Sequence, residues 1–121
     1  MAGPRLRIQV CVLCGEDGTD AAAPGRRLHD LLAAAAGDGI AVEPVACLAV
    51  CDRPVSLVFR GASGRWCYLV GGADPERDVA DILAAGRAVA ASPQGIPAMA
   101  DRPPFFRDGV IARLPPAAPD D

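Results

Sequence analysis

The sequence contains no lysine, and all of its basic residues are arginine. With a formal net charge of -3 and a pI near 5.0, it offers no basic stripe that could follow a phosphate backbone, so we expect no nucleic-acid partner. It has a single histidine with no nucleophile paired to it, and it lacks phosphate-binding and dinucleotide-binding fingerprints. We therefore expect a protein that is not an enzyme.

Long apolar runs are also missing. No segment approaches the roughly 20 apolar residues that a membrane-spanning helix needs. The N-terminus resembles a secretion signal superficially, but Gln9 interrupts its apolar run, and Gly15-Glu16-Asp17 follows in place of a cleavage site. We expect a soluble cytoplasmic protein with one core, because 121 residues are too few for two.

Cysteine, by contrast, occurs five times, and four of the five form close pairs. Two residues separate Cys11 from Cys14, and three separate Cys47 from Cys51. The odd count and the missing secretion signal favour a reduced metal site over a disulfide scaffold. Four thiolates suit either a tetrahedral zinc ion or the two irons of a [2Fe-2S] cluster.

The hydrophobic pattern predicts a mixed α/β fold of the order βαβ-ββα, with a four-stranded mixed sheet and two helices. The predicted elements are a strand over residues 5–13, a helix from Arg26 to the glycines at 37 and 39, a strand over 40–46, a hairpin of 55–60 and 65–70, and a helix from Asp74-Pro75 to about Ser92. These elements form a predicted domain over residues 1–95. The proline-rich residues 96–121 are predicted to form an extended arm that packs on the same domain.

This order brings the cysteine pairs together. The first two strands should be parallel neighbours, and parallel strands end at the same edge of a sheet. One pair follows each strand, so we expect a single site formed by Cys11, Cys14, Cys47 and Cys51. With iron, each pair would bind one metal atom. Zinc remains an alternative, and a reactive dithiol of Cys11 and Cys14 is a weaker one, because about ten residues separate Cys14 from the helix that would stabilise its thiolate.

Other residues have plainer interpretations. Cys67 shares a strand face with Leu69 and is interpreted as a small core residue. His29 lies among charged residues and is interpreted as part of a solvated helix face, and Gly71-Gly72 as a turn. The tail carries a group of arginines and aromatics that forms either a docking surface or an arm over one sheet face: Arg102, Phe105, Phe106, Arg107 and Arg113.

Two resemblances extend this interpretation. Cys47-Leu-Ala-Val-Cys51, followed by Pro54 and a hairpin, resembles the thioredoxin-like [2Fe-2S] ferredoxins and the related small subunit of respiratory complex I, although that group spaces its first cysteine pair more widely. From Cys11 through Pro116 the chain is also similar to domain of unknown function family 1636, predicted bacterial metal-binding proteins. The motifs that carry this similarity are Cys11-Val-Leu-Cys14, Cys47-Leu-Ala-Val-Cys51-Asp-Arg-Pro54, Trp66-Cys-Tyr68-Leu-Val-Gly71, Arg102-Pro-Pro104 and Gly109-Val-Ile-Ala-Arg113-Leu-Pro115.

The resemblance implies a small metal-binding protein, a [2Fe-2S] one-electron carrier whose all-cysteine cluster has a potential of about -400 mV. A zinc protein with a four-cysteine site is the alternative function. The expected partner is a redox protein. A homodimer is a further expectation, because both helices should cover one sheet face and leave the other to the arm or to a second copy.

Overall fold

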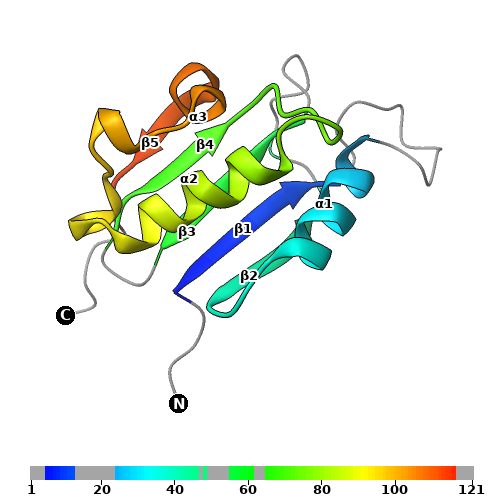
Figure 1. Cartoon of the computed structure of the whole chain (residues 1–121), viewed down its shortest axis with the longest axis horizontal. Coiled ribbons are helices and arrows are strands. Elements are labelled where there is room, and N and C mark those ends of the chain that lie inside the picture. The colour runs from blue at the N-terminus through cyan, green and yellow to red at the C-terminus, as the bar shows by residue number, and fades with distance from the viewer. Residues whose placement is uncertain (1–4, 13–23, 47, 49–54, 62–64, 117–121) are drawn as a thin grey trace.

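A computed structural model describes residues 5–12, 24–46, 48, 55–61 and 65–116 (Figure 1). It contains a five-stranded mixed sheet in the order β2-β1-β3-β4-β5. The strands are β1 (Leu6–Cys11), β2 (Ile40–Val45), β3 (Leu57–Gly61), β4 (Cys67–Val70) and β5 (Val110–Leu114). As predicted, β1 and β2 are parallel, in a register that runs from Leu6 opposite Ile40 to Cys11 opposite Val45. The remaining neighbours are antiparallel.

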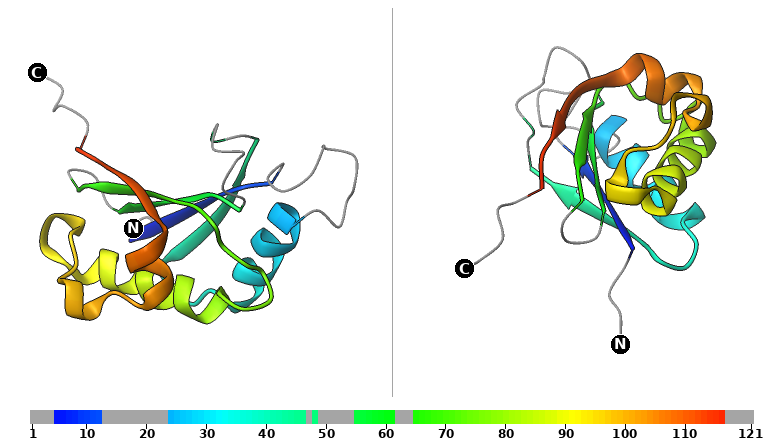
Figure 2. Two further views of the ribbon diagram at one scale, coloured as in Figure 1. Left: turned by 90° about the horizontal axis from the view of Figure 1, so that it is seen from above. Right: turned by 90° about the vertical axis from the view of Figure 1, so that its left-hand side faces the viewer.

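The helices α1 (Pro24–Ala35), α2 (Val79–Ala91) and α3 (Pro104–Gly109) all lie against one face of the sheet (Figure 2). Alternation along β1 sends Leu6, Ile8 and Val10 into this helical layer, where each is fully buried. Leu28 and Leu32 of α1 pack into the same core. None of the helices in the described ranges is long and apolar enough to cross a membrane.

The end of the chain differs from the prediction. Residues 104–114 are not an extended arm, because they fold into α3 and into a fifth strand paired with β4. Phe106 anchors this region, since it is fully buried and packs edge-on against Phe59 and Tyr68, with ring centroids 5.4 and 4.9 Å away. Pro104 opens α3, where proline suits the first turn. The predicted four strands and two helices are therefore wrong in number, whereas the mixed α/β class is confirmed. The division into residues 1–95 and 96–121 stays a prediction.

The start of α2 also differs. The sequence predicts a helix from Asp74-Pro75, but the first helical residue is Val79 and the N-cap is Asp78. Residues 75–77 form turns and Asp78 a bend, and the Asp78 carboxylate accepts a hydrogen bond from the Asp74 backbone N–H at 2.8 Å. This loop and the end of β4 lie at the same edge of the sheet as the carboxyl ends of β1 and β2.

Candidate metal centre

Cys11 is the described member of the predicted four-cysteine site. It ends β1 and is only 2% exposed. Its backbone N–H donates to the Ser56 carbonyl at 3.1 Å, which fixes the end of the strand against the start of β3. Its Sγ donates to the Ala46 carbonyl across 3.7 Å. The thiol therefore faces the residue that follows β2.

The ends of β1 and β2 are held side by side beyond the sheet pairs. Val12 N–H donates to the Val45 carbonyl at 3.0 Å, which continues the ladder for one more residue. Leu48, two residues after Ala46, packs partly buried against the core. The predicted convergence of the two strand ends is therefore confirmed, and the Cys11 thiol lies beside Ala46, the residue before Cys47.

Cys14, Cys47 and Cys51 lie outside the described residues. Among the residues that the structure describes, no group of three or more His, Cys, Asp or Glu side chains is placed to hold a metal ion. The four-cysteine set and its cofactor therefore stay predictions. Cys11 fits such a site, because it is a soft donor, buried, at the expected strand end and directed at Ala46, the residue before Cys47.

The first turn of α1 packs directly on Cys11. Gly25 is buried there, and a Cβ added to it would overlap the Cys11 carbonyl oxygen and lie 3.1 Å from the backbone of Val12. Glycine is needed for so close an approach of two backbones. The long sequence separation between Cys14 and the helix therefore hides a spatial contact between the helix and Cys11, which no local pattern predicts.

His29 and Cys67 lie elsewhere. His29 Nδ1 is 2.9 Å from Asp30 Oδ1 on α1, and the His29 side chain is only 16% exposed, so the interpretation of a solvated position is not confirmed for this residue. Cys67 is 6% exposed, so its predicted burial is confirmed, but it packs on the sheet face opposite the helices, where Arg60 Nη1 donates to its Sγ at 3.5 Å. The register places Cys67 level with Arg7, about 13 Å along the sheet from Cys11, too far to ligate the same site.

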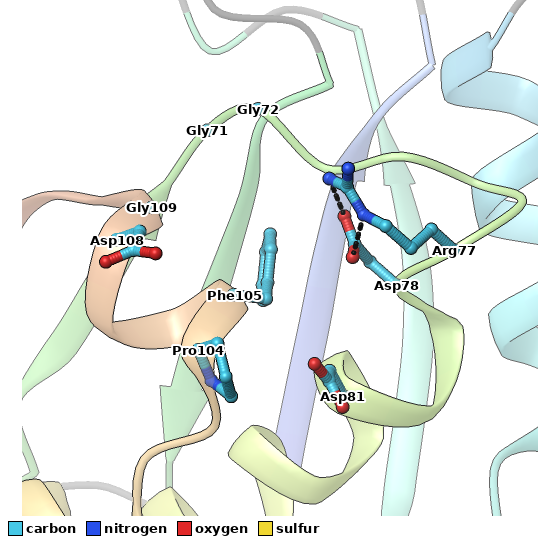
Figure 3. Close-up of a pocket in the computed structure, with 9 residues that line it drawn as sticks. All are labelled: Gly71, Gly72, Arg77, Asp78, Asp81, Pro104, Phe105, Asp108 and Gly109. Atoms are coloured by element: carbon cyan, nitrogen blue, oxygen red, sulfur yellow. Dashed lines mark hydrogen bonds and ion pairs between the residues drawn. The ribbon is translucent and has the colours of Figure 1, made fainter.

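Two pockets lie at the Cys11 edge of the sheet. One, of about 440 Å³, is bounded by Pro24, Val55, Ala73 and the start of the β4–α2 loop. The other, of about 460 Å³, lies between that loop and α3 and is lined by Phe105 and by three carboxylates (Figure 3). Gly72, which lines both, has φ +77°, a conformation that glycine adopts readily, but residues 71–74 form neither a turn nor a bend, so the interpretation of Gly71-Gly72 as a turn is not confirmed.

Asp78 is a buried polar residue at this edge that the sequence patterns above do not single out. It is 3% exposed, and Arg77 Nε and Nη2 donate to its carboxylate at 2.8 and 3.1 Å (Figure 3). The hydrogen bond from Arg77 lowers the pKa of Asp78, helped by the Asp74 N–H and opposed by burial. Its position directly before the helical stripe that begins at Val79 marks it as an N-cap in the sequence, but its side chain makes no capping hydrogen bond.

Comparison with known proteins identifies the family. Residues 8–116 match the model of a family described as "Protein of unknown function (DUF1636)". The chain belongs to this family. Among solved structures, the fold is similar to that of a thioredoxin-like [2Fe-2S] ferredoxin from Aquifex aeolicus, at 16% identity and a TM-score of 0.57, over 96% of this chain and 99% of that one. This similarity shows a thioredoxin-like fold. No curated protein matches.

The motifs of this DUF1636 chain have structural roles where they are described. Trp66 to Gly71 contains the whole of β4. Arg102 precedes α3 and lies over the rings of Tyr68 and Phe106, 5.4 and 5.3 Å from their centroids, while its Nη2 donates to the Tyr68 hydroxyl. The motif at 109–115 contains β5. The motifs outside the cysteine pairs therefore build the carboxyl-terminal half of the sheet.

Proposed function

We propose that this DUF1636 protein holds a [2Fe-2S] cluster through Cys11, Cys14, Cys47 and Cys51 and carries one electron at a time. The observation that carries the proposal is the contact of Cys11 Sγ with the carbonyl of Ala46, the residue before Cys47. Two cysteine-containing segments leave neighbouring parallel strands at this point. Four thiolates are the ligand set that a [2Fe-2S] cluster takes.

The described residues suit the task. A bound cluster would supply the one-electron chemistry. Burial of Cys11 at 2% exposure keeps water from its sulfur, and the Ser56 carbonyl and the first turn of α1 fix its backbone. A site fixed in this way changes little when the charge on it changes, as an electron carrier requires.

The fold gives further support. The Aquifex structure, which has the same fold over nearly the whole of both chains, is that of a thioredoxin-like [2Fe-2S] ferredoxin. The physiological partner would then be a redox protein that donates or accepts the electron. We expect neither catalysis nor nucleic-acid binding, in keeping with the net charge of -3 and the lone histidine.

A zinc protein with the same four-cysteine site is the second candidate. The observation that favours it is the spacing of Cys11 and Cys14, since two intervening residues fall within the two to four that are typical of zinc ligand pairs. In that case the same four thiolates would hold one ion, and the protein would have a structural or metal-handling role.

Metal analysis of the purified protein distinguishes the two functions. The full chain is prepared with and without air, and its visible absorption, iron, inorganic sulfide and zinc are measured, followed by electron paramagnetic resonance after reduction. We expect a coloured protein with two irons and two sulfides per chain in the anaerobic sample, as the formula of the cluster requires. A colourless protein with one zinc per chain from both preparations would overturn the cluster proposal.

A further inference from the structure

Helix α1 begins at the candidate metal centre. Its second residue, Gly25, is buried against the Cys11 carbonyl, and its first, Pro24, lines the 440 Å³ pocket together with Val55. Val55 directly precedes Ser56, whose carbonyl accepts the Cys11 N–H. The amino end of a 12-residue helix is thus packed on the backbone of a predicted ligand.

The charges on this turn are unusual for a helix start. Helix N-termini favour acidic side chains, because the aligned peptide dipoles place a partial positive charge there. The first turn of α1 contains no acidic residue, and Arg26 and Arg27 follow Gly25. Arg27 forms an ion pair with Glu76 of the β4–α2 loop. Exposed Arg26 adds a second positive charge to an end that is already positive.

An anion at the Cys11 end would account for this arrangement. Four thiolates would make the candidate site negative, and each electron that a cluster gains from a donor protein would add one negative charge. Cations and a helix amino end close to such a site stabilise the added charge. Arg26 would therefore cost the isolated helix some stability and stabilise the reduced state of such a site.

We propose that the amino end of α1 tunes the metal centre, with Gly25 as the positioning residue that brings the helix onto Cys11 and Arg26 as the residue that stabilises the reduced state. This inference rests on the proposed function for its redox part. Its positioning part applies to zinc as well, because the helix would stabilise thiolates around either metal.

The positioning part is tested with Gly25→Ala against Gly37→Ala. Gly37 follows the other end of α1, where an added Cβ meets nothing within 4 Å. Each full-length protein is loaded anaerobically, and release of its metal to a chelator is followed by absorption and metal analysis. Loss of a residue that orients a ligand typically weakens metal binding about 10–100-fold, and we expect this for Gly25→Ala alone. Equal retention by the two variants would overturn the positioning role.

The proposed effect of the Arg26 charge is tested by comparing Arg26→Glu with Arg87→Glu. Arg87 is an exposed arginine two turns into α2 and serves as the control. The reduction potential is measured by dye-equilibrated titration, and the unfolding of the metal-free proteins is measured in urea. Arg26→Glu should disfavour the reduced state by about threefold, which is about 30 mV for one electron. It should leave the metal-free fold no less stable, because an acid suits a helix start. An unchanged or higher potential would overturn the tuning role.

The two proposals fail separately. If every preparation contains zinc and no iron, the electron-carrier function is wrong. The Gly25→Ala and Gly37→Ala comparison then still tests the positioning part through retention of zinc. If iron is present but the variants behave like their controls, the carrier function stands and the tuning by α1 is wrong.

Discussion

Cys11 and Cys67 are both nearly inaccessible cysteines at strand ends, 2% and 6% exposed, yet they lie at opposite ends of the sheet and in different surroundings. Cys11 faces the carbonyl of Ala46, beside the segment that contains Cys47. Cys67 begins β4, where its Sγ accepts a hydrogen bond from the Arg60 guanidinium. Burial alone therefore does not separate a candidate ligand from a packing residue, whereas the chain segments beside the sulfur do.

The Cys67 end is held by contacts among described residues. Arg65 Nη1 donates to the carbonyls of Ala90 and Ser92 at 3.1 and 2.6 Å, which joins the start of β4 to the end of α2. Arg113 lies 4.9 Å over the ring of Trp66. At the Cys11 end, the described contacts include the hydrogen bond of Cys11 to the Ser56 carbonyl and the packing of Gly25 on Cys11. Both ends are therefore held by packing among described residues.

The largest expected effect comes from exchanging the two cysteines for serine one at a time. Cys11→Ser removes one of the four thiolates, so we expect it to lose the cofactor and its visible absorption, because a hydroxyl is a much poorer ligand for iron or zinc. Cys67 lies about 13 Å along the sheet from Cys11, so Cys67→Ser should keep its full metal content. Metal analysis and absorption spectra measure both. Equal loss from the two variants would remove the distinction between the two ends.

Phe106→Ala tests whether the folded carboxyl-terminal region is part of the stable core. This fully buried ring contacts Phe59 and Tyr68, and its removal leaves a cavity, so the free energy of unfolding should fall by about 3–5 kcal/mol. Met99→Ala is the matched control, since Met99 is 64% exposed and should change stability by less than about 0.5 kcal/mol. Urea unfolding measures both. A loss for Phe106→Ala as small as the control's would mean that β5 and α3 are dispensable.

These regions also differ in how far the sequence predicts them. The alternation of Leu6, Ile8 and Val10 predicts β1, and the helix between the two strands predicts that β1 and β2 are parallel neighbours, and hence the convergence at Cys11. The region around Phe106 was missed because several prolines suggest an extended arm, although Pro104 opens a helix and the strand that follows it pairs with β4. Local patterns cannot show the contacts of Phe106 with Phe59 and Tyr68, which join distant parts of the chain.

The candidate site shows the same division. The strand order predicts that the ends of β1 and β2 meet, and the structure confirms this, whereas the meeting of the four cysteines stays a prediction. The packing of Gly25 on Cys11 was not predictable, because a prediction that starts the helix at Arg26 leaves Gly25 at the end of a loop of unknown path. Residues far apart in the sequence, such as Cys11 and Gly25, can still be in contact in the folded chain.

A smaller effect is expected at Asp78, on the Cys11 edge. The pKa of Asp78 is lowered in the folded protein, first by its hydrogen bond with Arg77, so its carboxylate stabilises the fold above the unfolded pKa of about 3.9. This stability is lost as the pH falls through the folded pKa. Asp78→Asn should lower the free energy of unfolding by about 1.5–3 kcal/mol at pH 7. It should also reduce the dependence of that free energy on pH in the acid range. Exposed Asp38→Asn is the control, measured in parallel by urea unfolding across the acid range. An unchanged pH dependence in the acid range would show that the Asp78–Arg77 pair does not stabilise this edge of the sheet.

The smallest effect is expected at the other end, from Arg60→Met. Arg60 Nη1 donates to Cys67 Sγ at 3.5 Å and its Nε to Gln9 Oε1 at 3.2 Å, and because Arg60 itself is exposed, the loss should be no more than about 1 kcal/mol. Methionine keeps the apolar part of the side chain over Cys67. Because the Cys11 site lies elsewhere, the metal content and reduction potential should match those of Arg87→Met. A shifted potential would mean that Arg60 acts along the whole sheet, and Cys67 would then belong to the electrostatic surroundings of the metal centre.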